Sequence, residues 1–401
     1  MVLRRAVLNR AMAVVGYEFA EGDELASADY ELDRGRALLR HVCAQDARKM
    51  VGDRIAFVAI GHKLLDDQMI DYLAWTNTTL LIRADALRRD DAQQIDRISA
   101  LKRAGVAVGL QDGRAALQNP ALADAIDVAF LSVAELLPPD LLQVSRQLSK
   151  QHPGLKLGIR GVETQEEFDA CCRLNFAFFQ GPFIRRRDEW SQTKVNPSAL
   201  RISDLLGRIR AGAELEEIAE QIKLDPMISY RILRVANSAA VGATQDIISI
   251  RDAVLIVGRE PLYRWLVLLL CVTAPTSPGQ QALLENALAR GRLMELLAGT
   301  DSTAAMRQAL FLTGMLSLLD VMFKVPMNSL MSQMTLPPEV TDALIRRSGS
   351  CARTLQLAEA CEQGDAAHVG ELCVKLGIDL DKFNQMLAEA GAWARESAQG
   401  I

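Results

Sequence analysis

The sequence changes its pattern near residue 187, and this change limits the folds that the chain can adopt. Before it, short apolar segments alternate with segments of helical periodicity. After it, the apolar residues follow a helical period throughout. The chain has 401 residues, enough for two or three domains of about 100–200 residues each. The pattern therefore predicts two domains of different class on one chain.

The first half predicts a parallel sheet covered by helices. Its extended segments are expected at 2–9, 13–19, 55–60, 78–82, 106–110, 128–133 and 156–159. Segments of helical periodicity lie between them, for example at 30–48 and 92–103. Alternating apolar strands and helices are typical of parallel strands that are buried on both faces. An open doubly wound sheet and a closed barrel both fit. No Gly-rich phosphate loop follows the first strand, which disfavours a nucleotide-binding doubly wound fold.

The second half predicts an all-helical domain. Asp225 precedes Pro226, which is a favourable N-cap followed by proline at the first helical position. Ser249, three residues before Asp252, resembles a capping box that opens a helix over 250–257. Further helices are expected at 262–272, 280–298, 304–319, 338–346 and beyond. The polar stretch 188–197 predicts a linker, so the expected domains are 1–187 and 198–401.

Composition excludes several classes of protein. The formal net charge of −5 argues against a chain built mainly to bind nucleic acid. The apolar run 265–272 is shorter than the roughly 20 residues of a membrane span, and the N-terminus carries no signal segment. A cytoplasmic protein without a membrane span is therefore expected.

The seven cysteines include no C-x-x-C pair, and the four histidines are not at metal-ligand spacing. These residues predict neither a disulfide framework nor a zinc site.

Three segments of the first half occur in the order of a known family. Residues 14–20 (Val-Val-Gly-Tyr-Glu-Phe-Ala), 161–164 (Gly-Val-Glu-Thr) and 179–182 (Phe-Gln-Gly-Pro) resemble, respectively, the naming strand, the E-G-V-E-T turn and the closing strand of the EAL domain. That domain is the barrel-type phosphodiesterase of cyclic di-GMP. The resemblance implies a TIM-like (β/α) barrel of EAL type, shortened from the roughly 250 residues of a complete barrel.

The second half resembles the HDOD domain, an all-helical relative of the HD phosphohydrolases. The resemblance is carried by the segments 225–229, 233–239 and 249–258. Together the two halves resemble the EAL–HDOD signalling proteins, and this resemblance covers nearly the whole chain.

The resemblance also implies where catalytic metal ions would bind. Active EAL enzymes hold divalent ions with carboxylate and amide oxygens, and the ions activate a water molecule. Glu18 stands at the position of the first ligand. The other ligand positions and the catalytic lysine position are occupied by Ala59, Leu81, Gln111-Asp112, Phe130, Ser132 and Arg160. A guanidinium cannot ligate a metal, so the sequence predicts no catalytic residue and no metal site in the barrel.

The residual positions of that site are Glu18, Asp112, Arg160, Glu163 and Gln180. One hypothesis is that Glu18 and Asp112 form an ion pair with Arg160. Two interpretations of the acids stay open: polar residues satisfied by their neighbours at strand ends, or a residual nucleotide or metal site that binds without turnover.

The helical half lacks the side chains for the metal chemistry of its HD relatives. No histidine occurs between His152 and His368, and the position of the HD dipeptide reads Ser317-Leu318. Loss of this dipeptide is usual for the HDOD class, so the resemblance implies no metal hydrolysis in this domain.

These observations predict a non-catalytic signal-transduction or scaffold protein that acts by protein–protein interaction in cyclic di-GMP-related regulation. It is expected not to be an enzyme and to need no cofactor. As the resemblance implies, the expected partners are other signalling proteins, such as cyclic di-GMP enzymes and kinase pathway components, and a homo-oligomer also fits. Two alternatives stay open: a receptor that binds cyclic di-GMP without cleaving it, and a weak cyclic di-GMP phosphodiesterase.

Overall fold

The computed structural model describes residues 2–21, 28–43, 51–75, 77–83, 92–187, 197–237, 247–273, 279–299, 302–334 and 336–399. The predicted linker lies outside the described residues, except for Pro197. The chain forms two compact units. The barrel unit comprises Met1–Arg186, Ser277–Thr300 and Thr354–Ile401, and the helical unit comprises Arg187–Thr276 and Asp301–Arg353. The predicted domain boundary stays a prediction.

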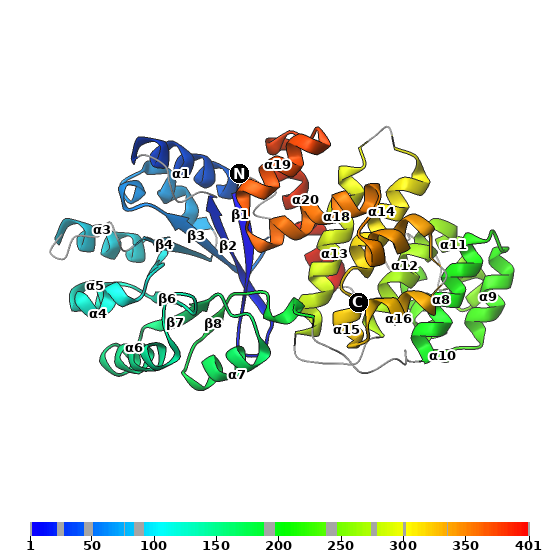
Figure 1. The fold of residues 1–401 in the computed structure, drawn as a ribbon, viewed down its shortest axis with the longest axis horizontal. Coiled ribbons are helices and arrows are strands. Elements are labelled where there is room, and N and C mark those ends of the chain that lie inside the picture. Colours follow the sequence, from blue (N-terminus) through cyan, green and yellow to red (C-terminus); the bar gives the residue numbers. More distant parts are fainter. Residues whose placement is uncertain are drawn as a thin grey trace. The chain divides into compact units, whose positions relative to one another are not determined.

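The barrel unit is built on eight strands that close in sequence order (Figure 1). The strands are β1 Val2–Leu8, β2 Val14–Glu21, β3 Ile55–Ile60, β4 Thr78–Ile82, β5 Ala107–Leu110, β6 Val128–Ser132, β7 Lys156–Arg160 and β8 Phe178–Phe179. Strands β2 to β8 are parallel, whereas β1 is antiparallel to both β2 and β8. The predicted TIM-like barrel is confirmed, and an open sheet is excluded.

A tight turn reverses the direction of β1. The side chain of Asn9 accepts hydrogen bonds from the backbone nitrogens of Ala11 at 2.9 Å and Ala13 at 3.0 Å. The following β2 then pairs back on β1, which puts Arg5 opposite Glu18 in the register. The antiparallel strand thereby carries two arginines, Arg4 and Arg5, towards the edge where the parallel strands end.

Among the described residues, helices of unequal length cover the outside of the barrel. The α-helices between strands are α1 Ala28–Cys43, α3 Ala92–Arg103, α4 Arg114–Gln118, α5 Pro120–Ala125, α6 Pro138–Gln151 and α7 Gln165–Arg173. Short 3₁₀-helices, η1 His62–Leu64 and η2 Gln68–Trp75, follow β3, and η4 Phe183–Arg185 follows β8. The predicted shortening therefore occurs in the connections and leaves the strands complete.

The centre of the barrel is filled by aromatic rings. Phe57, Phe130 and Phe178 pack together, with ring centroids 5.8 Å apart for the first two and 5.3 Å for Phe57 and Phe178. Gly158 on the neighbouring β7 leaves room for one ring, because a Cβ there would come 2.5 Å from the Phe130 side chain. This packing is a solid core below the mouth of the barrel.

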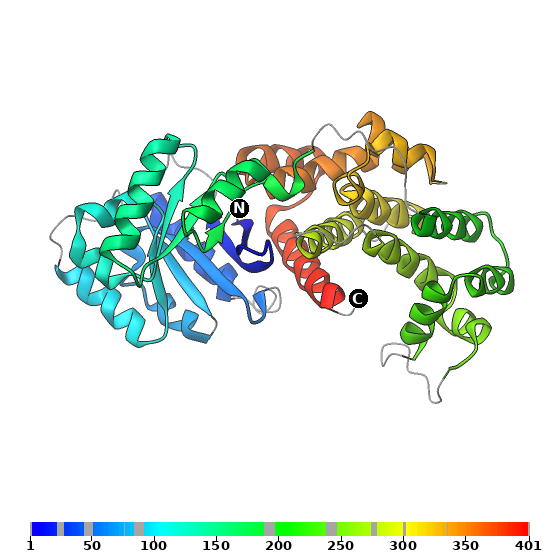
Figure 2. The same ribbon diagram turned by 90° about the horizontal axis from the view of Figure 1, so that it is seen from below.

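Four helices from the second half of the sequence also belong to the barrel unit, in whole or in large part. They are α13 Gln280–Leu297, α18 Ser350–Gln363, α19 Ala366–Leu376 and α20 Leu380–Gln399. Helix α13 packs along α20 (Figure 2). A buried cluster holds α13 against β2: the hydroxyl of Tyr17 donates to Glu285, which also accepts from Arg54 Nη1 at 2.6 Å and Nη2 at 2.7 Å.

The helical unit contains no strand among its described residues, as predicted. Its elements are α8 Pro197–Arg210, α9 Leu215–Lys223, α10 Pro226–Ala236, α11 Ile250–Val257, α12 Arg259–Val272, α14 Ala304–Leu316, α15 Leu319–Phe323, α16 Met327–Ser332, α17 Pro338–Thr341 and the π-helix η5 Asp342–Arg346.

The stretch Ala304–Phe323 is long and apolar enough to cross a membrane. Its most apolar 18-residue window has a mean hydropathy of 1.3, but 83% of that window is buried inside the fold. Such burial is typical of a core helix of a globular domain.

We expect Asp225→Ala to lower the stability of the helical unit by about 1–2 kcal/mol. Asp225 caps α10, because its Oδ1 accepts from the backbone nitrogens of Met227 at 2.9 Å and Ile228 at 3.1 Å. Urea unfolding followed by circular dichroism measures the change. Asp204→Ala is the matched control, since its carboxylate is 58% exposed and only pairs with Arg208 within the same helix. Equal effects of the two substitutions would contradict the capping role.

Candidate functional site

A cavity of about 320 Å³ opens in the barrel unit at the carboxyl ends of β7 and β8. Strand β1 forms one wall, the segments after β7 and β8 form another, and helices α13 and α18 complete the lining. Its charged residues are Arg4, Arg5, Arg160, Arg185 and Glu362. Even when the adjacent Glu18, which pairs with Arg160, is counted, four cations stand against two carboxylates, so the cavity favours an anionic ligand. We call it the basic pocket.

Beside the pocket, the carboxylate of Glu18 is bonded by Arg160 and Gln180, two other residues of the predicted residual site. Arg160 Nη2 donates to Glu18 Oε1 at 2.5 Å, and Gln180 Nε2 donates to Oε2 at 2.8 Å. Arg160 Nε in turn donates to Gln180 Oε1 at 3.2 Å. Glu18 is only 2% exposed, so these bonds compensate its burial. The hypothesised Glu18–Arg160 pair is present.

The Arg160 guanidinium also lies on the aromatic core, with Cζ 4.8 Å from the centroid of the Phe130 ring. A cation over a ring face is attracted by the ring quadrupole. Phe130 occupies the position at which the EAL resemblance expects the catalytic lysine. The cation next to this position is Arg160 of the adjacent strand β7.

The other two residual acids lie away from this cluster. Asp112 pairs with Arg114, whose Nη2 is 2.7 Å from Asp112 Oδ2, so the hypothesised Asp112–Arg160 pair does not form. The reason is local: both residues begin the turn into α4. Burial raises the pKa of Asp112, but the bonds from Arg114 outweigh it and the net shift is downward. Glu163 is exposed, and the neighbouring Thr164 caps α7 in a capping box with Glu167.

The side chains do not fit the pair of divalent ions that the EAL resemblance implies. The ends of β3 and β4 carry Ala59 and Leu81, which offer no oxygen ligand. Within the described ranges, no three histidine, cysteine or acidic side chains gather closely enough to hold a metal ion. Both carboxylate oxygens of Glu18 are occupied as acceptors.

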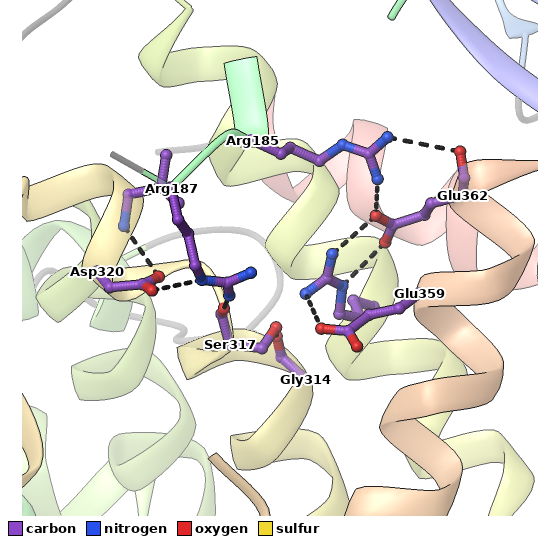
Figure 3. A network of polar contacts seen from close by, with 9 residues as sticks. Arg185, Arg187, Gly314, Ser317, Asp320, Glu359 and Glu362 are labelled. Atoms are coloured by element: carbon purple, nitrogen blue, oxygen red, sulfur yellow. Dashed lines mark hydrogen bonds and ion pairs between the residues drawn. The ribbon is translucent and has the colours of Figure 1, made fainter. Parts of the chain in front are cut away.

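On the far side of the pocket, Glu362 links α18 to α13 and η4 through hydrogen bonds (Figure 3). It lies at the end of α18 and accepts from Arg290 Nε at 2.9 Å and Nη2 at 2.7 Å, and also from Arg185 of η4. Burial raises the pKa of Glu362, but the two arginines outweigh burial and hold the pKa at about 2. This carboxylate therefore stays ionised at neutral pH.

Most residues of this pocket had not been predicted from the sequence. Asn286, Glu362 and Gln363 come from helices assigned to the other domain, and no spacing in the sequence connects them to the strands. Two signals were available in the sequence: the adjacent basic pair Arg4 and Arg5 on the first strand, and the run of three arginines that begins at Arg185.

The helical unit has its own buried acid, next to the predicted HD position. Arg187 Nε donates to Asp320 Oδ2 at 2.6 Å, and its Nη2 donates to the backbone oxygen of Ser317 at 2.9 Å (Figure 3). The Asp320 side chain is 3% exposed. The backbone of Ser317, at the predicted HD position, and the neighbouring Asp320 thus hold an arginine together.

The second half of the chain matches a known protein family. Residues 195–366 match the family model of the HDOD domain. This part of the chain is an HDOD domain.

Two relatives extend the comparison beyond that domain. Over 410 residues, the chain is 26% identical to the cyclic di-GMP phosphodiesterase CdgJ of Vibrio cholerae serotype O1, with 98% of this chain and 92% of the relative covered. It is also 26% identical over 298 residues to YuxH of Bacillus subtilis, with 72% of this chain and 71% of that protein covered.

The N-terminal region resembles EAL domains of known structure. One is Bacillus subtilis YkuI, solved with cyclic di-GMP and calcium, at 17% identity and a TM-score of 0.38 over 45% of this chain and 52% of that chain. Another is the EAL domain of Mycobacterium smegmatis DcpA, at 22% identity and a TM-score of 0.37 over 45% of this chain and 87% of that chain.

These comparisons correct one prediction. The expectation that the chain is not an enzyme is contradicted, because its relative over 98% of its length is a cyclic di-GMP phosphodiesterase. The expectation was based on counting motif ligands one position at a time. Such a count takes no account of the similarity of the remainder of the chain.

Proposed function

We propose that the chain is a cyclic di-GMP signalling protein that takes this nucleotide in its basic pocket. The observation that carries the proposal is the set of four arginines around one cavity at the carboxyl ends of the strands. A cyclic dinucleotide carries two phosphodiester anions, and guanidinium groups bind phosphate oxygens with paired hydrogen bonds. Its relative CdgJ, named for the same nucleotide, supports this choice of ligand.

The size and setting of the pocket support a partly enclosed ligand. A volume of about 320 Å³ is at the lower end of the roughly 300–1,000 Å³ of ligand pockets. The cavity therefore suits one half of the dinucleotide, with the other half towards solvent. Arg160 and Arg185 are 20% and 19% exposed. Each pairs with a carboxylate, and the positive charge that they add to the pocket is less screened than on an open surface.

Hydrolysis of the nucleotide is the second candidate, and the name of CdgJ favours it. Attack on a phosphodiester increases negative charge on the phosphoryl oxygens, and arginines placed around the phosphate stabilise that charge. Arg5 and Arg160, which both line the pocket, would act in this way.

The predicted association with other signalling proteins, and a cytoplasmic location, remain part of the proposal. Large apolar side chains in the helical unit support association, because they gain from being covered. Met227 is 60% exposed, Tyr230 62% and Ile256 51%. Mixing the purified chain with a cyclic di-GMP enzyme of the same host, followed by size-exclusion chromatography, tests this part; separate elution at micromolar concentrations would contradict it.

Calorimetric titration with cyclic di-GMP tests the main proposal. We expect a Kd of about 1–100 µM, equivalent to about 5–8 kcal/mol of binding free energy. Titrations with and without Mg²⁺ or Mn²⁺, and chromatography of the reaction for linear product, separate binding from hydrolysis. Absence of heat and of any thermal stabilisation at millimolar nucleotide would contradict the proposal, and binding without product would remove the second candidate.

A further inference from the structure

Three polar side chains of the basic pocket make no hydrogen bond to any other residue that the structure describes. They are Arg5 on β1, Asn286 on α13 and Gln363 on α18. Neighbouring polar groups of the lining are occupied: Arg160 by Glu18, and Arg185 by Glu362. The pocket thus presents donors from β1, α13 and α18 that the described part of the protein does not use.

The position of Arg5 follows from its packing. Its guanidinium lies against Gly364, because a Cβ at that glycine would come 2.6 Å from Arg5 Nε. Gly364 has a φ of +79° and follows the last residue of α18, Gln363. The negative end of the α18 dipole therefore favours the Arg5 cation at this place.

The two carboxylates that lie beside or in the pocket, Glu18 and Glu362, are both bonded to groups other than Arg5. Glu18 is opposite Arg5 in the strand register, but its oxygens accept from Arg160 and Gln180. Glu362 lines the same pocket, but it accepts from Arg185 and Arg290. The charge of Arg5 is left for a ligand.

We propose that Arg5, Asn286 and Gln363 form an anion subsite that takes one phosphate group of a nucleotide. Arg5 offers two parallel N–H groups to the phosphate oxygens, and each carboxamide offers a further N–H. The choice of a nucleotide as the ligand rests on the proposed function. The inference adds which side chains bind one of its phosphate groups. Because Asn286 and Gln363 lie within the residues that match the HDOD family, ligand binding depends on both halves of the sequence.

Titration of full-length variants with cyclic di-GMP, and separately with inorganic pyrophosphate, tests the subsite. We expect Arg5→Gln to raise the Kd about 10–100-fold, which is the loss expected for a charge-assisted pair of hydrogen bonds. Arg103→Gln is the matched control, since Arg103 is exposed on α3 outside the pocket and the change in net charge is the same. A control effect equal to that of Arg5→Gln would overturn the proposal.

Gln363 gives a second test that does not depend on Arg5. Its side chain is exposed, so substitutions there leave the fold intact. We expect Gln363→Glu to weaken binding by about fivefold or more and Gln363→Lys to strengthen it by about twofold or more, because the two changes place opposite charges beside the phosphate. Equal affinities of the two variants would overturn the subsite.

The two ligands separate failure of the subsite from failure of the proposed function. Cyclic di-GMP binding that is unaffected by Arg5→Gln overturns the subsite alone. Pyrophosphate binding that is lost in Arg5→Gln, without any binding of cyclic di-GMP, supports the subsite and overturns the proposed ligand. Absence of binding by either compound overturns both.

Discussion

Glu362→Gln is expected to lower the free energy of unfolding of the barrel unit by about 3–5 kcal/mol. Arg290 is 3% exposed and donates two hydrogen bonds to this carboxylate, and Arg185 donates to the same group. A carboxamide accepts through one oxygen and carries no charge, so the buried guanidinium of Arg290 loses the nearer of its two counter-ions. Urea unfolding at pH 7 followed by circular dichroism measures the loss.

The control for this prediction is Glu359→Gln on the same helix. Glu359 lies 3.7 Å from Arg290 Nη1, whereas Glu362 Oε2 is 2.7 Å from Nη2. We expect the control to cost less than about 1 kcal/mol. A Glu362→Gln effect no larger than that of the control would contradict the central role of Glu362.

The same carboxylate gives a pH dependence of defined sign. The pKa of Glu362 is lowered from 4.5 to about 2, so its contribution to stability is complete above pH 4.5. It is lost as the pH falls towards 2, and the shift corresponds to about 3 kcal/mol. The stability difference between the wild type and Glu362→Gln should therefore shrink over this range; a constant difference would contradict the assignment.

Phe130→Ala is expected to lower the free energy of unfolding of the barrel unit by about 3–5 kcal/mol. Phe130 is fully buried, and its ring contacts Phe57 at the centre of the barrel. The substitution leaves a cavity and removes the ring below the Arg160 guanidinium, which is worth about 0.5–2 kcal/mol in addition. Urea unfolding measures the loss.

Leu137→Ala is a suitable control for the core substitution, because Leu137 is 70% exposed in the same unit. We expect it to change stability by less than about 0.5 kcal/mol. A loss below about 1 kcal/mol for Phe130→Ala would show that the barrel repacks around the missing ring.

The strands of the barrel were predicted well because each carries its own local signal. The segments expected at 55–60 and 78–82 have the bounds of β3 and β4. Buried parallel strands are short continuous apolar runs, and this feature does not depend on distant residues. The start of α10 was predicted for a similar reason, since a cap and the residues it bonds are adjacent in sequence.

The candidate site was predicted only in part. Glu18, Arg160 and Gln180 were named from the family motifs and do meet, but Asp112 was placed with them and instead pairs with Arg114. Arg5 and Gln363 had no motif to identify them. That residues 358 positions apart in sequence line the same pocket depends on how helices pack, and packing leaves no periodic pattern in the sequence.

The sequence by itself determined the strands, the helices and their caps, because these follow from side-chain period and from hydrogen bonds between near neighbours. Tertiary structure decided the rest: which helices join the barrel unit, which carboxylate each arginine meets, and which cations remain for a ligand. Ion pairs form between whichever opposite charges the packed backbone brings within about 4 Å. For Glu362, Arg185 and Arg290, that distance was fixed by the fold of the whole barrel unit.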